Sequence, residues 1–301
     1  MATRKPVIGF VGQGFVGKAT ANNFERRGFS VIRYALEPEY RANKHRIKEA
    51  DIVFVAVPTP TTPKGHHTGI VEEAISLARP GATVVIKSTI LPGTTSRLQK
   101  KFPRVVLLHN PEFLSEKTAQ KDTDEPFANV IGMPVSDAAH TKAAKVVLSI
   151  IPKAPFKLIC SSEEAEIYKY AHNVSGYTQI LSFNLIYDIA KHFGAQWEQI
   201  QKAIEADPYI CTRYASPVHK SGRGAGGACF IKDFAAFAKH HRALIAHPTA
   251  SAFTKAAEKH NIALLMETQK DIDLLKGVYG PGVTAQERGG KRAKKRARRS
   301  R

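Results

Sequence analysis

A glycine pattern near the amino terminus constrains the fold more than any other feature of this sequence. Residues 12–17 read Gly-Gln-Gly-Phe-Val-Gly and directly follow an apolar run at residues 7–11. Gly12 permits a tight turn out of a strand, Gly14 lets a pyrophosphate approach the backbone, and Gly17 lets a helix pack on the strand. A helix over residues 18–27 would direct backbone N–H groups at that pyrophosphate. The pattern therefore predicts a strand, a turn and a helix that bind a dinucleotide.

Dinucleotide sites of this kind usually have an acidic residue about 20 residues beyond the last glycine, where it binds the ribose hydroxyls. The second strand is expected over residues 30–34, and Ala35 stands directly after it. Glu37 follows and is the predicted ribose partner, with a solvated loop carboxylate as the alternative. A carboxylate at this place favours NAD over NADP. We therefore predict NAD as the cofactor.

Short β-rich runs alternate with helical stretches through the first half of the chain. This alternation predicts an α/β fold, in which a Rossmann-type parallel sheet has helices on both faces. Further strands are expected over residues 51–57, 82–87, 104–108, 129–132 and 156–160. The second half is mainly helical, with helices expected over residues 163–193, 197–206, 233–246 and 249–275. We predict an NAD-binding domain over residues 1–160, a helical central domain over 161–276, and a linker with a disordered basic tail over 277–301.

Composition bounds the partners and the compartment. The net charge is +19, and residues 289–301 contain eight Lys or Arg and no acid. Such a tail could attract a polyanion such as nucleic acid or an acidic protein, or it could serve only solubility. No apolar run approaches the roughly 20 residues that span a bilayer. Three cysteines are too few for a disulfide framework, so we expect a cytoplasmic protein.

A second glycine-rich stretch lies in the helical half. Residues 224–233 read Gly-Ala-Gly-Gly-Ala-Cys-Phe-Ile-Lys-Asp and contain Cys229. Glycines let the backbone approach a ligand closely, and a cation such as Lys232 favours the nucleophilic thiolate. We predict Cys229 as a nucleophile, with a small buried cysteine beside a turn as the alternative.

Six motifs, taken together and in this order, resemble the nucleotide-sugar 6-dehydrogenase family over about residues 6–275. They are the glycine pattern, Val-Pro-Thr-Pro at 57–60, Lys-Ser-Thr at 87–89, Asn-Pro-Glu-Phe-Leu-Ser-Glu at 110–116, Lys-Tyr-Ala-His-Asn at 169–173, and the Cys229 stretch. The resemblance implies an NAD-dependent oxidation of a nucleotide sugar, with UDP-glucose as the first candidate, from the C6 alcohol to the carboxylate. Cys229 would capture the intermediate aldehyde as a thiohemiacetal, and a second oxidation would give a thioester that water hydrolyses.

The resemblance also implies roles for other residues. Lys169 would stabilise developing oxyanion charge, and Asn173 would contact the substrate. The two residues are four apart and so share one face of the predicted helix. The alternative is that this face is only a solvated surface. Asp233 would order the catalytic water, Glu116 would be the base for thioester hydrolysis, and Thr89 would lie on the water and cofactor side. The remaining cofactor-binding residues are Phe15, Val16, Thr59 and Lys232, and the remaining substrate-binding residues are Phe113, Leu114, Gly222 and Gly226. No metal is implied.

Some features depart from the family pattern. An aromatic residue, a proline and two arginines are usual at positions that hold Ala225, Ile231, Ser115 and Tyr209 here. Family members normally continue into a third domain that helps to hold the nucleotide. We therefore expect a short form that lacks the C-terminal UDP-binding domain, and the central helices imply a homodimer.

Two other functions remain open on sequence alone. A two-electron hydroxyacid dehydrogenase also joins a Rossmann domain to a helical domain with a catalytic lysine on a long helix, although its chemistry has no role for the Cys229 motif. A non-catalytic dinucleotide-binding protein could attach to polyanions through its basic tail, and only the charge supports this interpretation.

Overall fold

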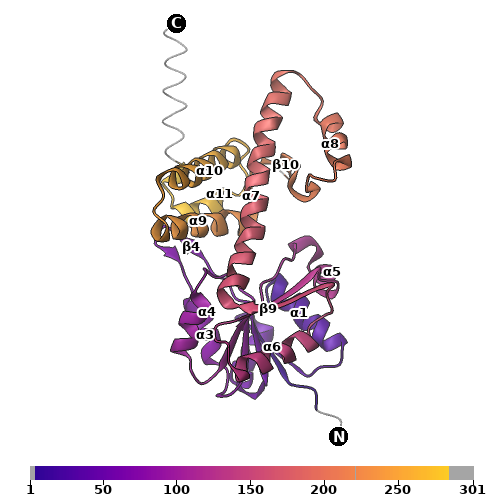
Figure 1. Cartoon of the computed structure of the whole chain (residues 1–301), viewed down its shortest axis with the longest axis vertical. Coiled ribbons are helices and arrows are strands. Elements are labelled where there is room, and N and C mark those ends of the chain that lie inside the picture. Colours follow the sequence, from indigo (N-terminus) through magenta and orange to yellow (C-terminus); the bar gives the residue numbers. More distant parts are fainter. Residues whose placement is uncertain (1–3, 221, 285–301) are drawn as a thin grey trace. The chain divides into compact units, whose positions relative to one another are not determined.

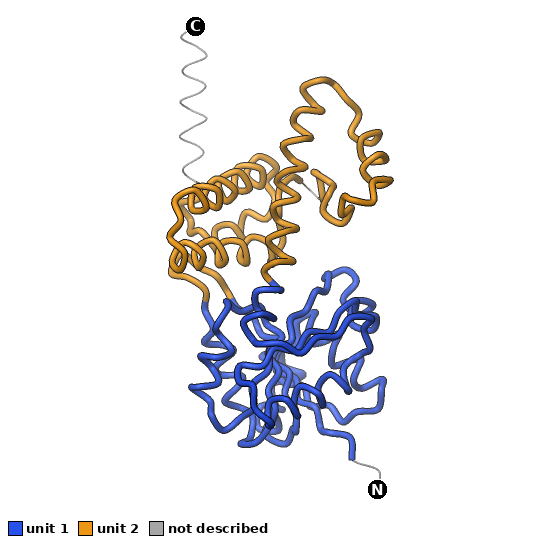
Figure 2. The backbone as a smooth tube through the Cα atoms, viewed as in Figure 1, with its two compact units in different colours: residues 1–59, 67–169 blue, residues 60–66, 170–301 orange. Residues whose placement is uncertain are grey.

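The computed structural model describes residues 4–220 and 222–284, which divide into two compact units (Figure 2). The first unit contains the residues up to 59 together with 67–169, and the second contains 60–66 and the residues from 170 onward. The sequence places the domain boundary at 160/161, whereas the units meet at 169/170, inside helix α7 (Ser162–His192). The predicted basic tail, residues 289–301, lies outside the described residues.

A seven-stranded sheet with the order β2-β1-β3-β6-β7-β8-β9 forms the centre of the first unit. Its strands are β1 (Ile8–Val11), β2 (Val31–Tyr34), β3 (Ile52–Val55), β6 (Thr83–Ile86), β7 (Val106–His109), β8 (Ala128–Met133) and β9 (Phe156–Ser161). The pairs from β2 to β7 are parallel, but β8 pairs with β7 in the antiparallel sense and β9 runs parallel to β8. The Rossmann-type fold is confirmed, with a mixed sheet in place of the predicted parallel one.

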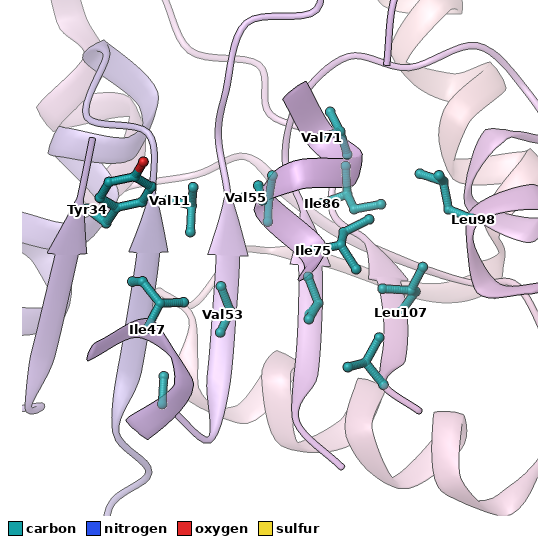
Figure 3. Close-up of a cluster of buried hydrophobic side chains, with 14 of the residues drawn as sticks. Val11, Tyr34, Ile47, Val53, Val55, Val71, Ile75, Ile86, Leu98 and Leu107 are labelled. Carbon is teal, nitrogen blue, oxygen red and sulfur yellow. The ribbon is translucent and has the colours of Figure 1, made fainter. Parts of the chain in front are cut away.

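Helices cover both faces of this sheet. On one face, η1 (Ala42–Glu49), α3 (Gly69–Ser76) and α4 (Thr94–Lys101) pack Ile47, Ile75 and Leu98 onto the strands (Figure 3). On the other face, α1 (Phe15–Arg26) and α6 (Ala138–Ile150) contribute Phe24 and Val147. Strand β3 supplies side chains to both clusters, which explains why its sequence is continuously apolar. Shorter elements are α2 (Pro38–Arg41), η2 (Glu116–Thr118) and α5 (Ala119–Asp124).

The second unit is mainly helical (Figure 1). It holds most of α7, then α8 (Trp197–Ala206), η3 (Thr212–Tyr214), α9 (Gly227–Leu244), α10 (Pro248–Glu267) and α11 (Ile272–Tyr279). Two small hairpins belong to it, β4 (Thr61–Thr62) with β5 (Gly65–His66) and β10 (Val218–His219) with β11 (Gly222–Arg223). In its core the rings of Tyr177 on α7 and Phe234 on α9 stack, with centroids 3.8 Å apart.

Two helical predictions for this unit are wrong in their bounds. The helix expected over residues 249–275 is two helices, because Gln269 and Asp271 adopt positive φ angles of 55° and 54° that end α10 and precede α11. Residues 277–279, which the sequence assigns to the linker, belong to α11. The helix expected over 233–246 begins at Gly227, so Cys229 lies in its first turn. None of the helices in the described ranges is long and apolar enough to cross a membrane.

Candidate active site

The glycine turn between β1 and α1 has the geometry that a dinucleotide requires. Gly12 has a φ of +96°, and a Cβ there would lie 2.3 Å from the carbonyl oxygen of Ala56. A Cβ at Gly17 would lie 2.0 Å from the carbonyl oxygen of Gly12. Helix α1 can therefore pack against this turn only because residue 17 is a glycine. At Gly14, by contrast, a Cβ would meet no atom within 4 Å. That open approach fits the pyrophosphate of NAD.

The start of α1 completes this cradle. Gly14 is the N-cap and supplies no capping side chain, and the first turn contains no acidic residue. The backbone N–H groups of the first turn of α1, which contains Phe15 and Val16, are therefore available to an anion. Glu37 is exposed directly before α2, just beyond the end of β2. Its carboxylate is open to solvent there.

Two loops at the carboxyl ends of neighbouring strands are joined by hydroxyl groups. Ser88 Oγ accepts from the amide of Val57 at 3.0 Å and donates to its carbonyl at 2.7 Å. Thr59 Oγ1 donates to the carbonyl oxygen of Thr89 at 2.7 Å, and both threonines are buried. Two of the predicted cofactor-binding residues are thereby brought together beyond β3 and β6.

Lys169 is paired with a carboxylate that the sequence analysis does not single out, Glu112. The buried Lys169 Nζ donates to the carbonyl oxygen of Glu112 at 2.6 Å and lies 3.3 Å from its Oε1. The amide of Leu114 donates to the other carboxylate oxygen, Oε2, at 2.8 Å. The Lys169 ammonium also lies 5.2 Å from the ring centroid of Phe113. Glu116, the predicted base, is exposed in η2.

A second lysine, Lys87, is half-buried directly after β6. Its Nζ donates to Asn110 Oδ1 at 2.9 Å, and Asn110 Nδ2 donates to the carbonyl oxygen of Val130 at 2.9 Å. Burial lowers the pKa of Lys87 to about 8; the charge of Glu112 opposes this shift and that of Lys169 adds to it. The motif at 87–89 contains this lysine, but the sequence gives no sign of its contact with Asn110.

The second unit brings three of the predicted residues together. Asn173 Nδ2 on α7 donates to Asp233 Oδ2 on α9 at 2.7 Å, and both side chains are buried. Lys232 Nζ forms an ion pair with the other carboxylate oxygen of Asp233. Cys229 is exposed in the first turn of α9, four residues before Asp233, so the two share one face of that helix. Lys169 and Asn173 have the same spacing on α7.

Gly222 and Gly226 pack against side chains of their own unit. A Cβ at Gly222 would lie 2.4 Å from Thr268 Oγ1, and one at Gly226 would lie 2.1 Å from Asp271 Oδ2. Their lack of a side chain therefore has an intramolecular cause, besides any role in substrate binding. No group of His, Cys, Asp and Glu in the described ranges could hold a metal ion.

These residues could support covalent oxidation chemistry. A thiol at a helix N-terminus is a potential nucleophile, and a buried carboxylate held by an amide and an ammonium can orient water. A lysine fixed by a carboxylate offers positive charge to a developing oxyanion.

Two sequence models of one family match this chain. The NAD-binding domain of the UDP-glucose/GDP-mannose dehydrogenase family matches residues 36–149, and the central domain of the same family matches residues 163–263. Together they match more than half of the chain.

Individual proteins agree with this result. A UDP-glucose 6-dehydrogenase from Haloferax volcanii is 28% identical, in a match that covers 78% of this chain and 65% of that protein. A UDP-glucose dehydrogenase structure from Pyrobaculum islandicum superposes with a TM-score of 0.74 at 25% identity, covering 88% of this chain and 71% of that one. Matches to other curated relatives span about half of their length.

The fold of this chain is also similar to that of a dehydrogenase of a second class. The 3-hydroxyisobutyrate dehydrogenase of Mycobacterium tuberculosis superposes with a TM-score of 0.69 over 91% of this chain and 98% of that one, at 17% identity. At that identity the likeness concerns the fold alone.

Proposed function

This chain belongs to the UDP-glucose/GDP-mannose dehydrogenase family and carries its NAD-binding domain, and we propose that it oxidises the C6 alcohol of a nucleotide sugar to the carboxylate. UDP-glucose is the first candidate substrate, because relatives such as the Haloferax volcanii protein are named UDP-glucose 6-dehydrogenases. The observation that carries the proposal is the thiol of Cys229 in the first turn of α9, on the same helix face as a buried Asp233 that Asn173 holds.

The proposed reaction proceeds through a covalent bond to the protein. NAD, when bound, accepts the hydride in each of the two oxidations. The first oxidation removes a hydride and a proton from the C6 alcohol and gives the aldehyde. The thiolate of Cys229 then attacks the aldehyde carbon. The C–S bond forms as the C=O π bond breaks, and the oxygen takes up a proton to give a thiohemiacetal. The second oxidation converts this group to a thioester. Water then adds to the thioester carbon, the C–S bond breaks, and the thiolate leaves as the carboxylate forms.

Lys169, Asp233 and Asn173 act around this covalent step. The ammonium of Lys169, steadied by Glu112, stabilises negative charge on the substrate oxygen. Asp233 accepts hydrogen bonds from Asn173 and Lys232, which fix its carboxylate for holding the hydrolytic water. Thr59 and Thr89 line the cofactor side of the first unit, beyond β3 and β6.

The first experiment measures NADH and acid formed by the purified protein from UDP-sugars, GDP-sugars and free sugars. We expect two NADH per molecule of one nucleotide sugar. Cys229→Ser should abolish acid formation, whereas Cys211→Ser, at another exposed cysteine of the second unit, should behave as wild type. Acid formation that survives Cys229→Ser would contradict the covalent mechanism. One NADH per substrate, insensitive to alkylation, would instead favour a hydroxyacid dehydrogenase.

We also propose that the chain is a cytoplasmic homodimer. None of its three cysteines forms a disulfide in the described part of the chain, which fits a reducing compartment. Leu185, Ile186 and Ile189 at the end of α7, with Phe193 just beyond it, are between 45% and 79% exposed. Their spacing places them on one side of the helix, and such an apolar surface suits a second copy of the chain.

A further inference from the structure

The glycine-rich segment before Cys229 packs, at every second residue, against the region where α10 ends and α11 begins. A Cβ at Gly222 would lie 2.4 Å from Thr268 Oγ1, one at Gly224 would lie 3.0 Å from Asn261 Oδ1, and one at Gly226 would lie 2.1 Å from Asp271 Oδ2. Alternate residues of an extended segment face the same side. This side of the segment is therefore in close contact with other parts of the same unit. A larger residue at any of the three glycine positions would push the segment away from them.

Asn261 on α10 holds the middle of the segment through the oxygen and the nitrogen of its side-chain amide. Its Oδ1 accepts from the backbone N–H of Ala225 at 2.7 Å, and its Nδ2 donates to the carbonyl oxygen of Ala225 at 3.0 Å. Asn261 is 2% exposed and Ala225 is fully buried. The side chain thus takes both backbone groups of one residue, as a neighbouring strand would.

Lys270 and Asp271 hold the two ends of the segment. The buried Lys270 Nζ donates to the carbonyl oxygens of Gly224 at 2.9 Å and Gly222 at 3.3 Å. Asp271 Oδ2 accepts from the backbone N–H of Gly227 at 2.7 Å. Gly227 is the first residue of α9, and the N-cap Gly226 offers no side chain, so Asp271 caps this helix from a distant part of the sequence.

Helix α7 holds the same segment from another direction. Arg223 donates to Asn184 Oδ1 at 2.7 Å and to the Asn184 carbonyl oxygen at 3.0 Å, and it pairs with Asp188 at 2.7 Å. Residues 222–227 are thus tied to two different parts of the unit, and Cys229 follows two residues after the last of these contacts.

We propose that Asn261, Lys270 and Asp271 form a clamp that positions the Cys229 thiol, because they fix residues 222–227 and the first turn of α9. The three are positioning residues and act through the backbone. A thiol at a helix N-terminus is favoured as thiolate by the positive end of the helix, and this effect is confined to the first turn. The clamp therefore sets the reactivity of Cys229. The inference rests on the proposed function only in taking Cys229 to be the nucleophile of the reaction.

Alkylation by iodoacetamide at pH 7, followed at each cysteine by mass spectrometry, tests the clamp without any substrate. Cys211 is exposed and serves as the reference. Cys160 reports unfolding of the first unit, because burial raises its pKa to about 11 and keeps it slow to react in the folded state. Asn261→Ala and Lys270→Met should lower the ratio of the Cys229 rate to the Cys211 rate about two- to fivefold, since the thiol leaves the helix terminus. Lys259→Met, at an exposed lysine of α10, is the matched control.

A second pair of variants tests the packing of the glycines. Gly226→Ala would place a Cβ against Asp271, whereas Gly277→Ala in α11 would meet nothing within 4 Å. We expect Gly226→Ala to lower the alkylation ratio as Asn261→Ala does, and Gly277→Ala to leave it unchanged. Asn261→Asp keeps the acceptor for the Ala225 amide but loses the donor, so its effect should be intermediate.

Steady-state turnover of the variants distinguishes a role of the clamp in positioning Cys229 from a role only in the stability of the fold. Asn261→Ala should lower kcat for the nucleotide sugar on the order of 100-fold while its KM stays near wild type, as expected for a nucleophile displaced by about 1 Å. If Asn261→Ala, Asn261→Asp and Gly226→Ala lowered the Tm but kept the wild-type alkylation ratio and kcat, the clamp would be only structural and the proposal would be wrong. If the wild type oxidises no sugar while the alkylation ratio responds, the clamp stands and the proposed function fails.

Discussion

Glu112 and Glu116 lie four residues apart in one motif, yet their surroundings differ. Glu112 is bound by Lys169 and by the amide of Leu114, whereas Glu116 is exposed in η2. The family resemblance implies Glu116 as the base. Residue type and motif position do not show which of the two carboxylates contacts Lys169. The Lys169–Glu112 contact joins residues that are 57 apart in the chain, so only tertiary packing reveals it.

This contrast gives a prediction for turnover. Glu112→Gln should lower kcat at least about tenfold, because Lys169 loses the charge that holds it in place for the developing oxyanion. Glu116→Gln is the matched control and should have the smaller effect. Steady-state kinetics with the substrate found in the sugar panel measure both. A larger loss in Glu116→Gln than in Glu112→Gln would contradict the positioning role of Glu112.

A third carboxylate, Glu166, gives a prediction for pH dependence. It is buried and accepts from the amide of Gly93, the amide of Thr95 and the Thr95 hydroxyl at the N-terminus of α4. Burial outweighs these donors and raises the pKa of Glu166 from 4.5 to about 7. The folded state therefore holds a proton that the unfolded state releases between these values. The stabilising contribution is present below pH 4.5 and is lost as the pH rises through about 7.

Urea unfolding at pH 5 and pH 7.5 measures this contribution. Glu166→Gln should remove the part of the pH dependence that is due to this group, which is at most about 3 kcal/mol in the free energy of unfolding. The exposed Glu73→Gln is the control and should keep the wild-type dependence. An identical pH dependence in wild type and Glu166→Gln would show that Glu166 titrates normally.

At the scale of elements, the apolar runs and the glycine turn predict most of the first unit. The strands appear within a few residues of their expected bounds. The central strands β1, β3, β6 and β7 are the most readily predicted, because they supply apolar side chains to both core clusters. The sequence does not reveal the reversed direction of β8, because the local residue pattern of a strand is the same in parallel and antiparallel pairs. The break after α10 was missed because its positive φ angles fall on Gln269 and Asp271 instead of glycine. The clamp has no motif of its own.

The turn between β1 and α1 yields a prediction for two substitutions of the same size. Gly17→Ala should destabilise the protein by about 2 kcal/mol or more, because the Cβ would collide with the Gly12 carbonyl. Gly14→Ala should fold with near wild-type stability, since a Cβ there meets nothing, but should weaken NAD binding about tenfold or more by filling the approach of the pyrophosphate. Urea unfolding and calorimetric titration with NAD measure the two effects. Wild-type NAD affinity in Gly14→Ala would place the pyrophosphate elsewhere.

At the scale of the whole molecule, the apolar surface at the end of α7 predicts association. Light scattering should give twice the mass of one chain for the wild type. Ile189→Asp should give the monomer, because it places a charge among exposed apolar side chains that a second copy would cover. Leu244→Asp, at an exposed leucine at the end of α9, is the control and should remain dimeric. A wild-type monomer would overturn the proposed dimer.

The path of the chain between the two units has a further consequence for how the protein is made and cut. The chain passes from one unit to the other after residues 59, 66 and 169, because the β4–β5 hairpin belongs to the helical unit. There Pro63 accepts from Lys239 of α9 and lies against Gly280. During synthesis this hairpin emerges long before Lys239 and Gly280. It therefore lacks these contacts until the ribosome has translated the residues up to the end of α11 and Gly280. A protease that cleaves α7 at the boundary would likewise leave two fragments that remain associated, with the hairpin of the first still seated in the second.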